Sequence, residues 1–352
     1  MNLKRYIPQP LKNLLAAIYI LGRLILRGRS SRELKLNLAG VLPPEGSLVH
    51  GGKVKLLHLR ERFGNTWQGF NLAYFVSSGL PFSPAIWIRL YKMLGVKVVW
   101  NQNGFAYPAL YQPEVVLRVN NLFQSIHLSH HVVFQTEFTK RCAEKFLGQI
   151  EVPSTILINP VDTKVFKPRE TPLAQEPLVI LMLGNHFESE ERMSVSLEAL
   201  RRLREEGLNL KLIILGHCEK DFAEDWIEKK GSYLQSQAPT LFQSAHILLH
   251  LKYLDPCPTA VLEALASGMP VIGSRSGGMP ELVNDASGVL LTVPEDFNTL
   301  HYPTPQEISE GIKKVAQNLP QYSSEARKQA VAKFDKIAWL ERHETLFNTL
   351  LK

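Results

Sequence analysis

Short β-rich runs alternate with helical segments along nearly all of the chain from Lys53 onward. This alternation constrains the fold most, because it is typical of doubly wound α/β domains built on parallel sheets. In the first half it predicts strands at 54–59, 70–76, 96–100 and 131–135, and helices at 84–94 and 136–146. In the second half it predicts strands at 178–183, 211–215, 247–251, 271–273 and 289–293, and helices at 190–206 and 324–351. We therefore expect an α/β protein of two domains, which suits 352 residues.

Prolines mark the expected boundary between the domains. Pro160, Pro168, Pro172 and Pro177 lie close together with few apolar residues between them, as in a linker. The expected organisation is a basic, apolar N-terminal segment (1–50), an N-terminal domain (51–170), a C-terminal domain (171–325) and a C-terminal helix (326–352). We expect that last helix to pack back onto the N-terminal domain.

Basic residues surround an apolar run near the N-terminus. Lys4, Arg5 and Lys12 precede residues 14–21, and Arg23, Arg27, Arg29 and Arg32 follow them. The run is shorter than the about 20 apolar residues that a membrane-spanning helix needs. No small-residue cleavage site follows it, which argues against a signal peptide. Two alternatives stay open: a helix lying on an anionic membrane surface, or a helix packed on the protein itself.

The net charge limits the kinds of partner to expect, and the cysteines indicate the cellular compartment. A formal net charge of +7 and a pI near 9.2 favour anionic partners. Lys and Arg form no stripe interleaved with aromatic residues outside the N-terminal segment, so we expect no nucleic-acid partner. The three cysteines and eleven histidines show neither a disulfide framework nor a zinc-binding spacing. We expect a cytoplasmic protein, peripheral on the inner face of the cell membrane, without a metal or other cofactor.

The stretch from Asp255 to Gly273 carries the most chemical information. Pro256 and Pro258 fix a stiff loop after a predicted strand, and Thr259 is expected to cap a helix that ends at Gly268. The free amides at Thr259, Ala260 and Val261 would then form an anion site at the carboxyl end of a strand, suited to a diphosphate without a metal ion.

Two carboxylates bracket that site. Asp255 lies before the helix and Glu263 lies within it, so they can address opposite ends of one ligand. Glu263 would accept hydrogen bonds from ribose hydroxyls, while Asp255 would stabilise positive charge at an anomeric carbon. The alternative is that Glu263 is an ordinary exposed helix residue and Asp255 a turn former.

Residues 255–283, which end in Ser-Arg-Ser-Gly-Gly-Met-Pro-Glu-Leu-Val, resemble the acidic motif and Gly-Gly loop of family 4 retaining glycosyltransferases of the GT-B fold. Segments 132–140, 156–166, 181–184 and 212–216 resemble other parts of that family. The resemblance implies two Rossmann-like domains facing across a cleft, and retention of anomeric configuration without a metal. It also assigns Asp255 to the donor sugar and Glu263 to the ribose of a nucleoside diphosphate sugar.

The chain departs from the family pattern at three places. Asn185, after Gly184, stands where the family has Arg, and Glu191 stands at its Lys position with Arg192 adjacent. Asn103 replaces the usual His, and it can orient a sugar hydroxyl but cannot exchange a proton. No glycine-rich loop of the usual form follows the first predicted strand, where Gly64 and Gly69 are the candidates.

Other residues complete the expected site. His186 is a candidate for a phosphate contact, with an ordinary loop residue as the alternative. Arg275, Gly277 and Gly278 would line the cleft beneath the donor sugar, with a plain turn as the alternative. The catalytic candidates are Asp255 and Asn103. The donor-binding candidates are Glu263, Thr259, Ala260, Val261, Gly184, Asn185, Arg192, Gly277 and Gly278.

We therefore expect a hexosyl-type glycosyltransferase that moves a sugar from a nucleoside diphosphate sugar to a glycan or lipid-linked acceptor, in cell-surface polysaccharide or lipopolysaccharide synthesis. The main alternative is a nucleotide-sugar-binding scaffold that has lost turnover, which the substitutions Asn103, Asn185 and Glu191 motivate. A dinucleotide oxidoreductase is a third, but no Gly-x-Gly-x-x-Gly follows an early strand.

Overall fold

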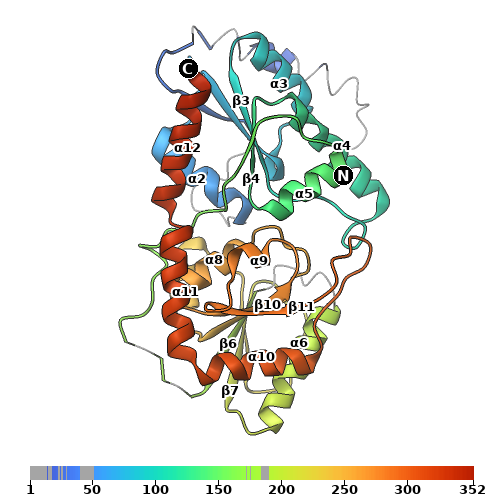
Figure 1. Ribbon diagram of the computed structural model, residues 1–352, viewed down its shortest axis with the longest axis vertical. Coiled ribbons are helices and arrows are strands. Elements are labelled where there is room, and N and C mark those ends of the chain that lie inside the picture. The colour runs from blue at the N-terminus through green and yellow to red at the C-terminus, as the bar shows by residue number, and fades with distance from the viewer. Residues whose placement is uncertain are drawn as a thin grey trace.

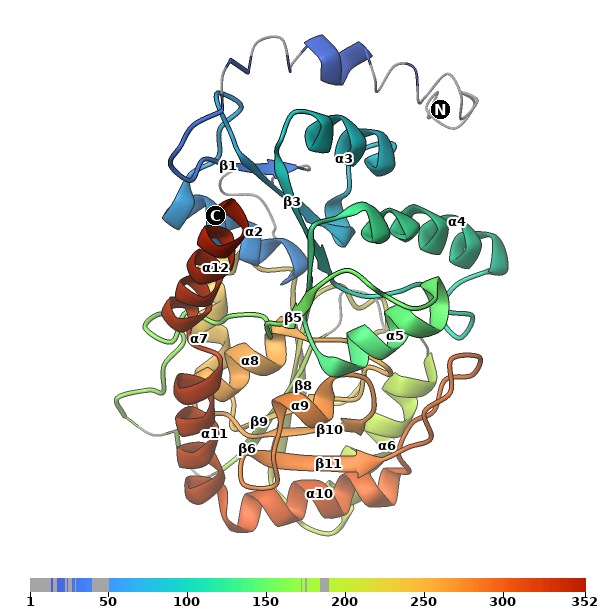
Figure 2. The same ribbon diagram turned by 45° about the horizontal axis from the view of Figure 1, so that its top comes forward.

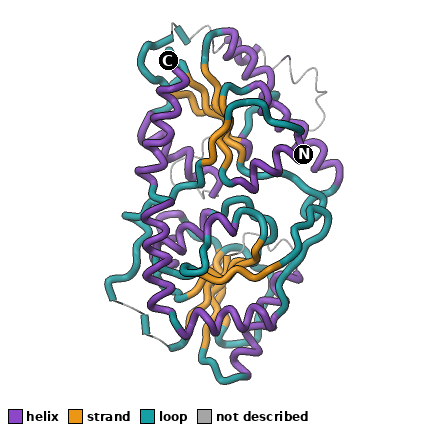
Figure 3. The backbone as a smooth tube through the Cα atoms, viewed as in Figure 1, coloured by secondary structure: helices purple, strands orange, loops and turns teal. Residues whose placement is uncertain are grey.

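The computed structural model describes residues 14, 18–22, 24, 27–28, 30–39, 51–171, 173–174, 176–183 and 190–352. For residues 51–53 it describes the backbone alone. The chain forms two halves along the long axis of the molecule, each a parallel sheet with helices outside it (Figures 1 and 3). The expected fold class, two parallel α/β domains, is confirmed.

The N-terminal half is built on a five-stranded sheet with the order β1-β2-β3-β4-β5. Its strands are β1 (Leu36–Ala39), β2 (Leu72–Val76), β3 (Lys97–Gln102), β4 (His131–Phe134) and β5 (Ser154–Ile156). Its helices are α2 (Gly51–Phe63), α3 (Pro84–Met93), α4 (Pro113–Phe123) and α5 (Glu137–Leu147), with short 3-10 turns at Ser77–Gly79 and Gln124–Leu128. All four neighbouring pairs of strands run parallel, so their carboxyl ends meet at one edge.

The C-terminal half is built on a six-stranded sheet with the order β11-β10-β9-β6-β7-β8. Its strands are β6 (Leu178–Leu183), β7 (Leu210–Leu215), β8 (Ile227–Gly231), β9 (Ile247–His250), β10 (Val271–Arg275) and β11 (Gly288–Thr292). Its helices are α6 (Glu190–Glu205), η4 (Gln235–Gln237), α7 (Ala238–Phe242), α8 (Thr259–Ala266), α9 (Met279–Leu282), α10 (Pro305–Gln317) and α11 (Leu319–Lys333). The strand order changes direction between β9 and β6, which are adjacent, so the carboxyl ends of these two strands form the crevice where such sheets bind ligands.

Two sequence predictions in the first domain are wrong. Residues 54–59 form part of helix α2 rather than a strand, because Leu56, Leu59 and Phe63 recur at helical spacing and pack on one face against the sheet. The first strand is instead β1 (Leu36–Ala39), which lies inside the segment set apart as 1–50. The N-terminal domain therefore begins at or before Leu36. The short strands β5 and β8 have no predicted counterpart, because their residues are largely exposed or half-buried and carry little apolar pattern.

The described part of the N-terminal segment contacts the protein on one side. Ile20 is fully buried in the core of the first domain, and the Tyr19 ring lies 6.1 Å from that of Trp87. Leu14, Ile18 and Leu21 remain about half exposed. Among the described residues, no helix is long and apolar enough to cross a membrane.

The C-terminal end of the chain crosses between the halves. The stretch predicted as one helix breaks at Phe334–Asp335 into α11, on the second domain, and α12 (Lys336–Leu351). Helix α12 runs beside α2, and its Trp339, Leu340 and Phe347 lie in one cluster with side chains of the first sheet (Figure 1). Phe334 leaves helical geometry at this break, and the backbone of Asp335 pairs there with Val161. Val161 belongs to residues 157–177, between β5 and β6, which we call the interdomain segment.

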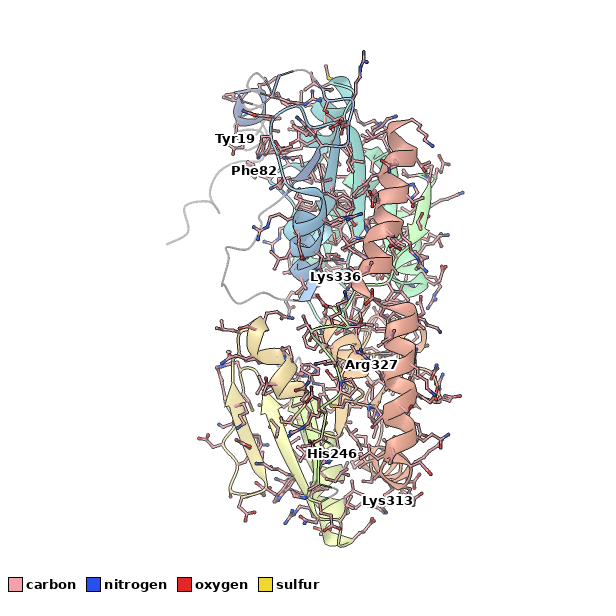
Figure 4. All side chains as sticks on the ribbon, turned by 90° about the vertical axis from the view of Figure 1, so that its left-hand side faces the viewer. Tyr19, Phe82, His246, Lys313, Arg327 and Lys336 are labelled. Atoms are coloured by element: carbon pink, nitrogen blue, oxygen red, sulfur yellow. The ribbon has the colours of Figure 1, made fainter. Side chains whose placement is uncertain are left out.

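Charged side chains fasten this crossing to the interdomain segment. Lys336, at the start of α12, lies 2.7 Å from Asp162, and Arg327 of α11 donates to the carbonyls of Thr163, Phe166 and Ala266. Figure 4 shows both side chains on the helices that connect the halves. The two domains are thus joined by two passages of the chain, which lie against each other.

Asp335 is expected to contribute to stability through this junction. Its carboxylate caps α12 by accepting from the amide of Ile337 at 2.8 Å, and it also accepts from the Thr163 hydroxyl. Loss of an N-cap costs about 0.5–2 kcal/mol, so Asp335→Ala should lower the unfolding free energy by about that amount. Asp335→Asn keeps an acceptor and should lose less. Urea unfolding followed by circular dichroism measures both, and equal losses would contradict the capping role.

Candidate functional site

The centre of the second domain presents a helix N-terminus at the carboxyl edge of its sheet. Strand β9 ends at His250, an eight-residue loop follows, and α8 begins at Thr259. The N-cap is Pro258 rather than Thr259, because Pro258 still has extended backbone angles and Thr259 is already helical. Thr259 and Ala260 are half-buried, whereas Val261 is buried and its amide already bonds the carbonyl of Pro258 at 3.1 Å. The amides of Thr259 and Ala260 therefore fit an anion better than that of Val261 does.

Asp255 lies in the loop before that helix and is only 8% exposed. Its Oδ2 is 3.1 Å from Nζ of Lys252 and 3.6 Å from Nε2 of His250. Burial opposes ionisation, but the positive charge of Lys252 and the contact with His250 outweigh it and hold the pKa of Asp255 well below its usual range. The structure therefore presents an ionised carboxylate at the edge of the crevice, and the turn-former alternative does not account for its ion pair with Lys252.

Glu263 is buried within α8, eight residues after Asp255. Its Oε1 accepts a hydrogen bond of 2.9 Å from Nε2 of Gln235, in η4. Burial raises the pKa of Glu263 to about 7, although the bond from Gln235 opposes that rise. Because the side chain is only 6% exposed, the alternative of an ordinary exposed helix residue is wrong.

Gly277 and Gly278 pack against the loop that holds Asp255, residues 251–258, which we call the acidic loop. A Cβ on Gly277 would meet the carbonyl oxygen of Asp255 at 2.5 Å, and one on Gly278 would meet that of Pro256 at 2.0 Å. Gly277 also has a positive φ of 63°, and the Gly278 amide donates to the carbonyl of Asp255 at 2.9 Å. The pair therefore holds the backbone of the loop and is more than a plain turn. Arg275 is 44% exposed and lies 3.7 Å from Asp285.

The first domain faces this loop with a buried polar network that no sequence motif predicts. Lys55 of α2 is almost fully buried, and its Nζ lies 2.6 Å from Oδ1 of Asn101, 2.6 Å from Oδ1 of Asn103 and 3.0 Å from Oδ1 of Asn159. Burial lowers the pKa of Lys55 to about 7, while the three amide oxygens match the three N–H groups of an ammonium ion. We call Lys55, Asn101, Asn103, Gln135 and Asn159 the Lys55 network.

The Lys55 network fixes the expected catalytic residue Asn103. The Oδ1 atom of Asn103 accepts from both Lys55 and Gln135, so its Nδ2 is directed to the Ser78 hydroxyl at 2.6 Å. Asn159 continues the network to the carbonyl of Cys257 in the acidic loop, at 3.2 Å. The orientation of Asn103 is therefore set by a lysine 48 positions away in the chain. No local pattern marks that lysine, since it follows Val54 in an apolar run.

Contacts across the crevice hold the two domains together. The Tyr107 hydroxyl donates to the carbonyls of Tyr253 and Leu254, and the Thr136 hydroxyl donates to that of Pro256. Glu281 of α9 accepts from the amides of Glu137 and Phe138, at 2.7 and 3.0 Å, at the N-terminus of α5 in the other domain. Figure 2 shows α5 lying over α9. A carboxylate suits this position because it complements the positive end of the helix dipole.

Part of the expected donor site lies outside the described residues. Gly184, Asn185 and His186 belong to that part. Glu191 and Arg192 follow at the start of α6, which begins after β6 and hence at the same sheet edge as α8. Arg192 is buried, with 4% of its surface exposed. Gly64 is not a phosphate-loop glycine, because its amide bonds the carbonyl of Arg60 and ends α2. Among the described residues, no three His, Cys, Asp or Glu side chains form a metal-binding group.

The fold and the crevice define a class of protein: two Rossmann-like domains arranged as in GT-B glycosyltransferases. Two solved structures carry this comparison. A sucrose-phosphate synthase from Thermosynechococcus elongatus superposes with a TM-score of 0.63 and 13% identity, over 85% of this chain and 76% of that chain. Anabaena HepE, in complex with UDP, superposes with a TM-score of 0.60 and 15% identity, over 84% of this chain and 81% of that chain.

Sequence comparisons add information on the second domain, which similar proteins match over part of their length. Residues 164–330 match the family model described as "Glycosyl transferases group 1". The Escherichia coli protein named "Putative colanic acid biosynthesis glycosyltransferase WcaL" is 30% identical over 39% of this chain and 37% of its own length. The MMP alpha-(1->4)-mannosyltransferase of Mycolicibacterium hassiacum is 29% identical over 40% of this chain and 36% of its own. The chain thus matches less than half the length of each of these two relatives.

Proposed function

We propose that the protein transfers a hexosyl group from a nucleoside diphosphate sugar to an acceptor hydroxyl, with retention and without a metal ion. One observation carries the proposal: Asp255 and Glu263 bracket the N-terminus of α8 at the crevice between the domains, within the segment that matches group 1 glycosyl transferases. Supporting it, HepE structures contain UDP and UDP-glucose.

Each part of the crevice has a task in this proposal. The diphosphate would lie on the amides at the start of α8, where the helix dipole favours negative charge. Arg192, with Gly184 and Asn185, would complete the phosphate site from the neighbouring strand. Glu263 would bind the ribose hydroxyls. Asp255 would face the donor sugar and stabilise positive charge that develops at its anomeric carbon.

The pathway and the location are also proposals. The acidic motif and Gly-Gly loop in residues 255–283 support family 4 membership. The likeness to a protein named for colanic acid biosynthesis supports a role in cell-surface polysaccharide or lipopolysaccharide synthesis. The exposed Leu14, Ile18 and Leu21, in a segment rich in Lys and Arg, support peripheral attachment to the inner face of an anionic membrane. The acceptor would then be a glycan or a lipid-linked glycan.

A second candidate function is a nucleotide-sugar-binding scaffold without turnover. The observation that favours it is Asn103, which stands where a titrating histidine was expected and is held by hydrogen bonds on both amide atoms. The same crevice would bind the nucleotide in both cases, so only turnover separates the two functions.

The proposal is tested by calorimetric titration of the protein with uridine, guanosine and adenosine diphosphates in EDTA. Saturable binding of one of them supports the donor site and identifies the base. The corresponding nucleotide sugars are then incubated with the protein, and slow hydrolysis or transfer distinguishes an enzyme from a scaffold. Failure of all three nucleotides to bind would reject both functions.

Glu263 gives this titration a pH dependence. Its raised pKa of about 7 means that the free protein binds a proton there at lower pH. If ribose hydroxyls donate to the carboxylate, nucleotide affinity should rise as the pH increases through about 7 and then level off. Glu263→Gln removes the charged acceptor, so affinity at pH 8 should fall by about 1.5–3 kcal/mol and lose that pH dependence.

The matched control for that variant is Glu219→Gln. The Glu219 side chain is 87% exposed, in the same domain, so its replacement should change neither the affinity nor the pH profile. An unchanged affinity in Glu263→Gln would remove the ribose assignment while leaving the diphosphate site untouched.

A further inference from the structure

A cavity of about 310 Å³ lies in the interdomain crevice, beside Asp255. The first domain contributes its walls from the segment after β3 and from helices α4 and α5, and the second domain contributes the acidic loop. The volume is near the lower end of the about 300–1,000 Å³ that small-molecule sites occupy. It suits one compact group rather than a long chain.

The residues that line the cavity form an apolar body and a polar end. Its body consists mainly of rings and aliphatic groups that are at most partly exposed, namely Phe105, Tyr107, Leu110, Val119, Phe123 and Phe138. Tyr111, which is 47% exposed, and Thr139, whose hydroxyl is paired with that of Thr136, also line it. Its polar end consists of Ser77, Ser78, Asn103, Lys252 and Asp255. A ligand that fits both parts therefore has an apolar portion and a polar head.

The body of the cavity is poorly suited to a bare sugar. The Tyr107 hydroxyl already donates to the carbonyls of Tyr253 and Leu254, so the ring rather than the hydroxyl is offered to a ligand. Sugar hydroxyls placed among these rings would lose water without gaining partners, at about 1–3 kcal/mol for each unsatisfied group. An apolar group gains from the same surface by leaving water.

The polar end lies where the proposed transfer takes place. Asp255 is the carboxylate assigned to the donor sugar, and Asn103 and Ser78 form a hydrogen-bonded pair at the same end of the cavity. A hydroxyl carried on an apolar body in the cavity would thus reach the donor site, while the body stays among the aromatic rings.

We propose that this cavity binds an apolar group, aromatic or compact aliphatic, that carries the acceptor hydroxyl. The acceptor is then an amphiphilic alcohol, which narrows the glycan or lipid-linked glycan proposed above to one that presents an apolar group beside its acceptor hydroxyl. This proposal rests on the proposed function for the role of the hydroxyl, and on the cavity alone for the binding of the apolar group.

The test uses a pair of alcohols that differ in their body, 3-phenyl-1-propanol and glycerol, with binding to the full chain measured by ligand-detected NMR. We expect saturable binding of the phenyl alcohol and none of glycerol at the same concentrations. Val119→Phe places a larger side chain in the cavity from α4, so it should weaken the binding of the phenyl alcohol at least tenfold. Leu117→Phe on the same helix is the control, because Leu117 is 65% exposed, and it should leave binding unchanged.

The outcomes separate the cavity from the proposed function. Equal binding of the two alcohols, binding of neither, or an unchanged affinity in Val119→Phe overturns the cavity proposal. A loss of fold in Val119→Phe is detected by circular dichroism, and Val119→Ala, which enlarges the cavity, then replaces it, with an affinity shift of at least threefold expected. Nucleotide titration of the same samples tests the donor site independently, so either proposal can fail while the other stands.

Discussion

Sugar transfer should fall by about 10²- to 10³-fold in kcat when Asp255 is changed to Asn, the loss typical of removing one electrostatic contact to a transition state. The reason is charge: Asp255 is ionised beside Lys252 and His250, and it is the carboxylate proposed to face the anomeric carbon. Asn preserves its shape but cannot stabilise positive charge. The measurement is initial-rate kinetics with the nucleotide sugar that the titrations identify, with release of the nucleoside diphosphate as the readout.

Nucleotide affinity provides the internal check on that result. It should stay near the wild-type value in Asp255→Asn, because the residues proposed to bind the diphosphate and the ribose lie on α8 and α6 and not in the loop that holds Asp255. Asp221→Asn is the matched control, since the Asp221 side chain is 95% exposed in the same domain. A variant that keeps most of its rate would mean that Asp255 supports the loop through Lys252 and takes no part in the chemistry.

Changing Lys55 to Met should be the most disruptive single substitution in the first domain. It leaves the Oδ1 atoms of Asn101 and Asn159 in the interior without their donor, while Oδ1 of Asn103 keeps only the bond from Gln135. Each unsatisfied buried group costs about 1–3 kcal/mol, so the unfolding free energy should drop by about 2 kcal/mol or more. Asn103 and the carbonyl of Cys257 lose their shared anchor as well, so transfer should also decline in protein that still folds.

Chemical unfolding in urea measures the first effect, and kinetics at a temperature where the variant is folded measures the second. Lys333→Met is the control, because Lys333 is exposed on α11, and it should change the unfolding free energy by less than about 0.5 kcal/mol. A rate that is unchanged in folded Lys55→Met would show that the Lys55 network serves stability alone.

The parts of the fold that the sequence predicted are those with a strong local pattern. Strands β6, β7 and β9 are almost wholly apolar, with Lys211 and His250 as the exceptions, and the sequence predicts them to within a residue or so because both of their faces are largely buried. Residues 54–59 were assigned wrongly, because a short apolar run fits a strand and a helix equally well. Strand β1 was missed because four residues in a basic segment carry too little periodicity.

Some residues of the candidate site could likewise be predicted from a local pattern, and others could not. Asp255 and Glu263 share one loop and one helix, so their relation could be predicted from spacing, and the tight turns at Gly277 and Gly278 follow the same stretch of chain. The Lys55 network could not be predicted, because its members come from α2, from the ends of β3 and β4 and from the interdomain segment. These five side chains come together only when α2 packs on the sheet and β3, β4 and β5 pair with one another.

The return of α12 to the first domain has a consequence for how the protein is made. Trp339, Leu340 and Phe347 belong to the same apolar cluster as Leu36 and Tyr74. The chain leaves the ribosome N-terminus first, at about 5–20 residues per second. The part of this sheet face that α12 covers beside α2 therefore stays exposed until the second domain has been synthesised. The first domain is therefore the last to be completed. A stop codon shortly before Lys336 would leave that apolar face open to water and to chaperones, although every strand of both sheets would already have been translated.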